Sequence, residues 1–141
     1  MEIRALFIDS VPIPCDNQTK AGRSVQEAVS MAIATEGLIR DMVAIVAREV
    51  EPQAIILFGS HATGDARHDS DVDLMVIEST PFGPGRDRRR EMTRLWHALA
   101  GFAVAKDILV YSREEVERWR DARNHVIARA LREGRLLYGS I

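Results

Sequence analysis

The order of apolar and polar residues predicts alternating helices and strands in the first half of the chain. Apolar residues recur at helical spacing over 36–50, and Thr35 stands where the N-cap of this helix is expected. The continuous apolar run 54–58 predicts a buried strand, and residues 72–77 predict another. Between these strands, residues 60–70 predict a loop with one helical turn.

The second half of the chain repeats this alternation. The pattern predicts a helix over 86–100, a strand over 104–111 and a helix over 112–120. A last helix is expected over 126–133, followed by a short extended segment at 136–138. Strands that alternate with helices indicate an α/β or α+β protein built on a small sheet.

Composition limits the class of protein. The chain has 141 residues, of which 46% are hydrophobic and 28% are charged, so we expect a folded globular protein. No apolar run approaches the roughly 18 residues of a membrane span. The single cysteine, Cys15, excludes a disulfide framework and a cysteine-based zinc site. We therefore expect a cytoplasmic protein without a membrane segment. We also expect no sequence-specific nucleic-acid reading, because no basic face with interleaved aromatic residues is visible.

Charge is unevenly distributed, although the net charge is only −2. Residues 54–80 contain five acidic residues and one basic residue, whereas residues 81–100 contain five arginines and two acidic residues. An acidic segment beside a basic one suggests that a cation and an anion bind together. The helix over 86–94 would then either add positive charge near a bound phosphate or contact a partner.

Two aspartates carry the clearest chemical signal. Asp71 and Asp73 flank one residue at the start of a predicted strand, so their side chains point to the same face, with Cα atoms about 6.5–7 Å apart. Two carboxylates at this separation repel each other unless a cation lies between them. Magnesium fits, because it prefers oxygen ligands and leaves coordination sites for phosphates and water.

A candidate phosphate site precedes these aspartates. Gly59 and Ser60 follow the strand at 54–58, and Gly64 lets the next loop turn back. Glycine allows backbone N–H groups to approach a phosphate closely, and serine adds a hydroxyl. An anion site next to a cation site fits a metal–triphosphate complex.

The stretch GSHATGDARHDSDVDLMV, which begins at Gly59, resembles the minimal nucleotidyltransferase branch of the DNA polymerase beta-like nucleotidyltransferases. The resemblance extends from about Leu38 to Tyr138. It implies a small mixed sheet flanked by helices over residues 34–141. Residues 1–33 form an N-terminal extension to which the sequence gives no role.

The resemblance also implies roles for individual residues. Asp71, Asp73 and Asp107 would be the catalytic residues, would bind two Mg²⁺ ions, and Asp107 would accept the proton of the attacking hydroxyl. ATP would be the substrate. Its phosphates would be held by Gly59, Ser60, His61 and Ser70. His61 and Thr63 stand where many relatives carry arginine, which lowers the positive charge expected near the triphosphate.

The short chain leaves no room for the acceptor-binding domain of larger relatives, so we expect the acceptor to be a separate molecule. Minimal nucleotidyltransferases of this kind commonly act as antitoxins that transfer AMP to a tyrosine of a HEPN-type ribonuclease toxin. Two alternatives remain open at this point: an antitoxin that acts by occlusion alone, and a small-molecule nucleotidyltransferase. The sequence also leaves open whether the protein forms homo- or hetero-oligomers.

Overall fold

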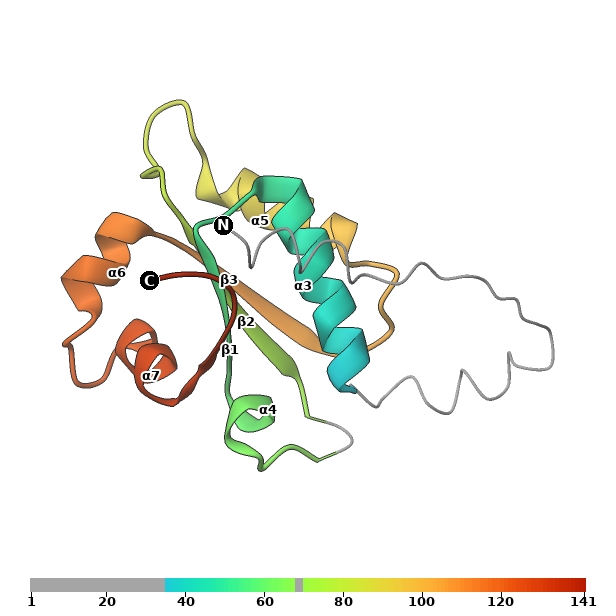
Figure 1. Ribbon diagram of the computed structural model, residues 1–141. Helices are drawn as coiled ribbons and strands as arrows, with labels where there is room; N and C mark the ends of the chain where they lie inside the picture. Colours follow the sequence, from blue (N-terminus) through green and yellow to red (C-terminus); the bar gives the residue numbers. More distant parts are fainter. Residues whose placement is uncertain (1–34, 68–69) are drawn as a thin grey trace.

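The computed structural model describes residues 35–67 and 70–141, so the expected N-terminal extension at 1–33 lies outside the described residues. Four strands form one sheet in the order β3-β2-β1-β4 (Figure 1). Strand β1 pairs antiparallel with β2 and with β4, whereas β2 and β3 are parallel. This mixed sheet confirms the predicted fold class. The strands are β1 (Ala54–Phe58), β2 (Val72–Glu78), β3 (Lys106–Ser112) and β4 (Arg135–Gly139).

Helices cover both sides of the sheet: α3 and α5 lie on one side, and α6 and α7 on the other (Figure 1). The short helix α4 follows β1. Within the described residues, no helix is long and apolar enough to cross a membrane. The helices are α3 (Glu36–Val50), α4 (Ser60–Thr63), α5 (Arg88–Ala98), α6 (Arg113–Trp119) and α7 (Val126–Glu133).

Local capping sets most of the helix ends. The Thr35 hydroxyl accepts a hydrogen bond from the Leu38 N–H at 3.1 Å and begins α3 as predicted. Ser112 and Glu115 form a reciprocal capping box that begins α6. Helix α5 was expected from residue 86 and instead begins at Arg88, because Asp87 caps it by accepting from the Arg89 N–H at 3.0 Å.

Gly134 ends α7, as expected for a C-cap, but its backbone is extended rather than left-handed. Its N–H donates to the Ala130 carbonyl at 2.8 Å. A Cβ atom at this position would overlap that carbonyl and the side chain of Ile56 in β1. The glycine is therefore required because the end of α7 lies against β1.

The two faces of the sheet differ in how they are covered. On the closed face, the apolar even-numbered residues of β2 and β3 are buried under α3 and α5, together with Leu95 of α5 and Leu99 directly after it. On the open face, α6 and α7 bury only the part of the sheet that carries Ile56, Met75 and Ile77. The odd-numbered residues at the start of β2 and β3 belong to this open face. No helix of the described residues packs over the side chains at these positions.

Candidate active site

Register across the sheet brings two of the predicted aspartates together. Asp73 in β2 lies opposite Asp107 in the parallel strand β3, and opposite Phe58 at the end of β1. Neighbouring strands lie about 4.7–4.9 Å apart, so the two aspartates are adjacent on the open face. Asp71 precedes β2 by one residue and shares this face by alternation. Asp71 and Asp107 are exposed, and Asp73 is partly buried.

The charges in this cluster act on one another. The pKa of Asp73 is raised to about 6, chiefly by burial and then by the negative charges of Asp107 and Asp71. Electrostatic interactions with His61 and Arg129 lower the pKa of Asp73 again. Two other acidic residues and two basic residues therefore act on the Asp73 carboxyl group.

The donor set fits a magnesium ion in its chemistry. Carboxylate oxygens are the hard ligands that Mg²⁺ prefers, and the repulsion that raises the pKa of Asp73 is what a cation would relieve. Within residues 35–67 and 70–141, however, no group of three or more His, Cys, Asp and Glu side chains is arranged as a ready metal site. The metal-binding role of the three aspartates stays a prediction.

Gly59 is packed against the central aspartate. Its φ of 79° lies in the region that favours glycine, and a Cβ atom here would overlap the Asp73 carboxylate, whose Cγ would lie only 3.2 Å away. Any side chain at this position would displace Asp73. The structure therefore shows a steric reason for the glycine that the sequence did not reveal.

The other predicted phosphate-binding residues border the same site. His61 Nε2 lies 3.3 Å from the Ser70 carbonyl oxygen, a hydrogen bond in which the ring N–H donates. The Ser70 hydroxyl accepts from the Arg67 N–H at 2.8 Å. No hydrogen bond within the described residues engages the Ser60 hydroxyl. His61 and Ser70 thus hold the loop together, and the role of these residues in phosphate binding stays a prediction.

Arg129, which the sequence analysis did not single out, is one of the residues whose charge acts on the pKa of Asp73. It belongs to α7, carries a largely exposed side chain, and lies 3.8 Å from Glu133 one turn later. Its charge nevertheless reaches Asp73, more than fifty residues earlier in the chain. No local pattern could reveal it, because its position depends on how α7 packs against β1.

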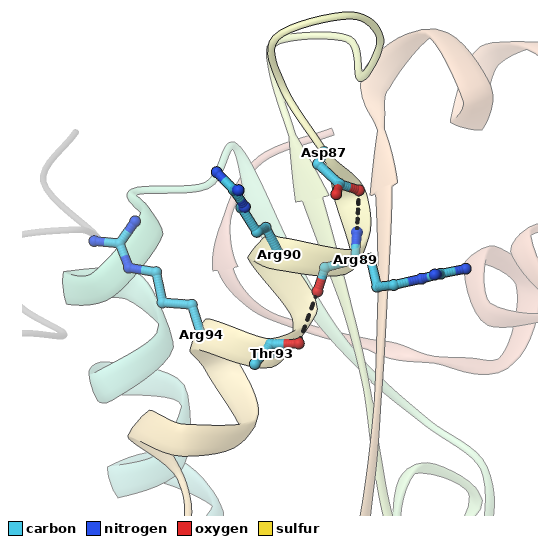
Figure 2. Close-up of a pocket in the computed structure, with 5 residues that line it drawn as sticks. All are labelled: Asp87, Arg89, Arg90, Thr93 and Arg94. Carbon is cyan, nitrogen blue, oxygen red and sulfur yellow. Dashed lines mark hydrogen bonds between the residues drawn. The ribbon is translucent and has the colours of Figure 1, made fainter.

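The arginines of α5 form a separate feature. A shallow pocket of about 380 Å³ is lined by Asp87, Arg89, Arg90, Thr93 and Arg94. Figure 2 shows Arg90 and Arg94 on one side of the helix and Arg89 on the other. Arg94 donates to Glu49 of α3 at 3.0 Å.

This arginine pocket lies away from the aspartates. Helix α5 packs on the closed face of the sheet, whereas Asp73 and Asp107 project from the open face. Arg88 of α5 reaches the open side but bonds Glu115 of α6, just after the end of β3, whereas Asp107 lies at the start of that strand. The described contacts therefore do not support the expectation that this helix places positive charge near a phosphate at the aspartates. The other expectation, contact with a partner, stays a prediction.

Comparison with known proteins identifies the family. The family described as "Polymerase beta, Nucleotidyltransferase" matches residues 41–140. No curated protein matches the chain. A solved structure titled "Crystal structure of the toxin-antitoxin with AMP-PNP" is similar at 22% identity and a TM-score of 0.46, over 71% of this chain and 73% of that chain. That similarity is too low to support a conclusion about function. The family match, by contrast, covers most of the chain and all four strands, and the chain therefore belongs to the polymerase beta nucleotidyltransferase family.

Proposed function

We propose that this protein is a Mg²⁺-dependent protein adenylyltransferase that transfers AMP from ATP to a tyrosine hydroxyl of a HEPN-type ribonuclease toxin, and so acts as its antitoxin. The observation that carries the catalytic part is the register of Asp73 with Asp107 on the open face, with Asp71 beside them. The family match supports nucleotidyl transfer. The toxin and its tyrosine rest on the resemblance of the sequence to minimal nucleotidyltransferases.

The reaction forms one bond and breaks one. The acceptor oxygen attacks the α-phosphorus of ATP, the bond from that phosphorus to the β-phosphate oxygen breaks, and pyrophosphate leaves. The proton of the acceptor hydroxyl passes to a carboxylate, for which we propose Asp107, exposed on the neighbouring strand. Mg²⁺ bound by the aspartates would orient the triphosphate and offset its charge. Gly59 leaves room for the Asp73 carboxylate, and the phosphates would bind beside it.

A separate protein as acceptor is supported by the architecture. The described residues form one sheet with its covering helices, and they contain no second unit that would hold an acceptor. Asp71 and Asp107 are exposed, so a side chain presented by another protein can approach the site from solvent. A tyrosine suits this approach, because it extends its hydroxyl well beyond the backbone that carries it.

The test is transfer of label from ATP to the partner. The full chain is incubated with Mg²⁺, ATP labelled at the α-phosphate, and the toxin encoded next to it. We expect label on a toxin tyrosine, identified by mass spectrometry, and none with the double variant Asp71→Asn/Asp73→Asn. Asp121→Asn, an exposed aspartate between α6 and α7, is the matched control and should transfer normally.

The same experiment separates the alternatives. If the wild-type chain neutralises the toxin without labelling it, and the double variant does so equally well, the protein acts by occlusion. If label appears instead on a small molecule added with the mixture, the acceptor is not a protein. Either result would overturn the proposal.

A further inference from the structure

The three aspartates of the candidate site are not held in place in the same way. Asp73 and Asp107 lie inside β2 and β3, opposite each other in the parallel ladder. Asp71 lies outside this ladder, because β2 begins only at Val72. On the C-terminal side of Asp71, the Val72 N–H donates to the Ala105 carbonyl at 2.9 Å. The position of Asp71 therefore depends on what holds the chain on its N-terminal side.

That side is held through Ser70. The Ser70 N–H donates to the Arg67 carbonyl at 3.0 Å, and the Ser70 hydroxyl accepts from the Arg67 N–H at 2.8 Å. The Ser70 carbonyl accepts from His61 Nε2 at 3.3 Å. This carbonyl and the N–H of Asp71 belong to one planar peptide unit. A side chain that holds the carbonyl therefore also restrains the backbone of Asp71.

His61 is carried by a turn that is itself well anchored. Helix α4 follows the end of β1, and the Ala62 N–H donates to the Gly59 carbonyl at 3.0 Å. Ala62 packs against the core of the closed face. Gly59 lies directly against the Asp73 carboxylate. This one turn of the chain therefore contacts Asp73 at Gly59 and reaches Asp71 through His61.

The hydrogen bond to Ser70 uses the ring nitrogen that a phosphate would otherwise need. A neutral histidine ring carries one N–H, and here that N–H is on Nε2 and is donated to the Ser70 carbonyl. The other nitrogen, Nδ1, is then an acceptor and cannot donate to a phosphate oxygen. Both His61 and Ser70 are partly buried, which limits competition from water. The contacts of the ring thus favour a role toward the loop over a role toward the nucleotide.

We infer that His61 is a positioning residue for Asp71. From α4 it holds the peptide between Ser70 and Asp71, and so keeps the Asp71 carboxylate beside Asp73, where both would bind Mg²⁺. This role replaces the direct phosphate contact that the family resemblance implies for His61. The inference rests on the proposed function, because it assigns a residue to the metal site of that reaction.

The first measurement is amide hydrogen exchange by NMR in the full chain, without nucleotide, metal or partner. The Ser70 amide, which donates to Arg67 directly before Asp71, reports on how this segment is held. We expect His61→Ala to speed its exchange about 2- to 10-fold, the effect of losing one hydrogen bond. His61→Gln should restore slow exchange, because the glutamine side-chain amide donates to the same carbonyl.

Thr63→Ala is the matched control. The Thr63 hydroxyl belongs to the same turn but donates to Asp65 at 3.0 Å and not to Ser70. Its loss should leave exchange at Ser70 unchanged. An equal increase in both variants would contradict the inference, because any loss from α4, and not the His61 hydrogen bond, would then loosen this segment.

The second measurement is the transfer reaction, with the concentrations of Mg²⁺ and ATP varied separately. A displaced Asp71 carboxylate binds a metal ion less well, so His61→Ala should raise the Mg²⁺ concentration for half-maximal rate about tenfold. At saturating Mg²⁺, the KM for ATP should change by less than about twofold. His61→Gln should restore most of the Mg²⁺ response. A direct phosphate contact would do the reverse, raising the KM for ATP and leaving the Mg²⁺ requirement unchanged.

The outcomes separate this inference from the proposed function. If Ser70 exchanges at the same rate in His61→Ala and in the wild type, the inference is wrong and the proposed function stands. A higher KM for ATP with an unchanged Mg²⁺ requirement would also contradict it, and would assign His61 to the phosphates. If the wild-type chain transfers no label, the proposed function fails, and exchange at Ser70 alone decides whether His61 holds the segment before Asp71.

Discussion

The two faces of the sheet use the same strands for different purposes. On the closed face, Leu74, Val76 and Ile108 are buried under two helices. On the open face, the residues next to them in sequence include Asp73 and Asp107, which no helix core covers. Because side chains alternate along a strand, a residue of the closed-face core is followed or preceded directly by a residue of the candidate site. The comparison teaches that the candidate site occupies the part of the open face that neither core covers, one residue along each strand from the core of the closed face.

Substitution of the adjacent residues Asp73 and Leu74 should give the largest difference between loss of transfer and loss of stability. Asp73→Asn should lower the rate of nucleotidyl transfer about 1000-fold or more, since the site loses a charge worth several kcal/mol in the transition state. The free energy of unfolding at pH 7 should stay equal or rise, because the pKa of Asp73 is raised in the folded protein and its ionised form is disfavoured there. Transfer assays and denaturant unfolding measure the two effects.

Leu74→Ala should do the opposite. Loss of this fully buried side chain should lower the free energy of unfolding by about 2–5 kcal/mol. In the fraction that remains folded, transfer per folded molecule should be close to normal. If Leu74→Ala instead abolished transfer in fully folded protein, the separation of the faces would be wrong.

Gly59→Ala tests whether this glycine positions the Asp73 carboxylate of the candidate site. The new Cβ would displace the Asp73 carboxylate and would require a left-handed backbone, which together cost about 1–3 kcal/mol. We expect transfer to fall about 10- to 100-fold, in line with an energy of this size. Gly83→Ala is the matched control, because a Cβ there meets nothing within 4 Å. Equal activity of both variants would show that Gly59 does not position Asp73.

The smallest expected effect on transfer is that of Glu78, at the opposite end of β2 from Asp73, which should act instead on the pH dependence of stability. Burial, followed by the nearby Glu91, raises the pKa of Glu78 to about 8, against an opposing effect of Arg86. The folded protein therefore keeps a proton that the unfolded chain releases above pH 4.5. The free energy of unfolding should be highest below pH 4.5 and fall as the pH rises through about 8.

Denaturant unfolding at several pH values measures this slope, and Glu78→Gln should flatten it without changing transfer. An unchanged slope in the variant would assign the pH dependence to other groups, of which Asp73 is the first candidate.

Most of the fold could be predicted from the sequence, because the patterns that specify the helices and strands are local. The apolar run at 54–58 and the capping box at Ser112 and Glu115 specify their elements without distant contacts. The start of α5 was misplaced by two residues, since Arg86 instead forms a β-bridge with Gly83. The start of β3 was also placed two residues early. There, Lys106 bonds to the carbonyls of Phe102 and Val104.

The candidate site was predicted only in part, for the same reason. Asp71 and Asp73 share a face by alternation, which a sequence shows directly. Asp107 came from the family resemblance, and the register of β2 with β3 places it opposite Asp73. The packing of Gly59 on Asp73 and the approach of Arg129 depend on tertiary contacts between residues far apart in sequence.

The return of the chain in β4 has a consequence for biosynthesis. Strand β4 pairs with β1, about eighty residues earlier, and Arg135 bonds to Glu36 at the start of α3. Contacts of such long sequence separation form late in folding. A nascent chain on the ribosome would carry all three aspartates before β4 has emerged, but α7 would not yet be anchored beside them. We expect nucleotide binding to be acquired only when synthesis of the last strand is complete.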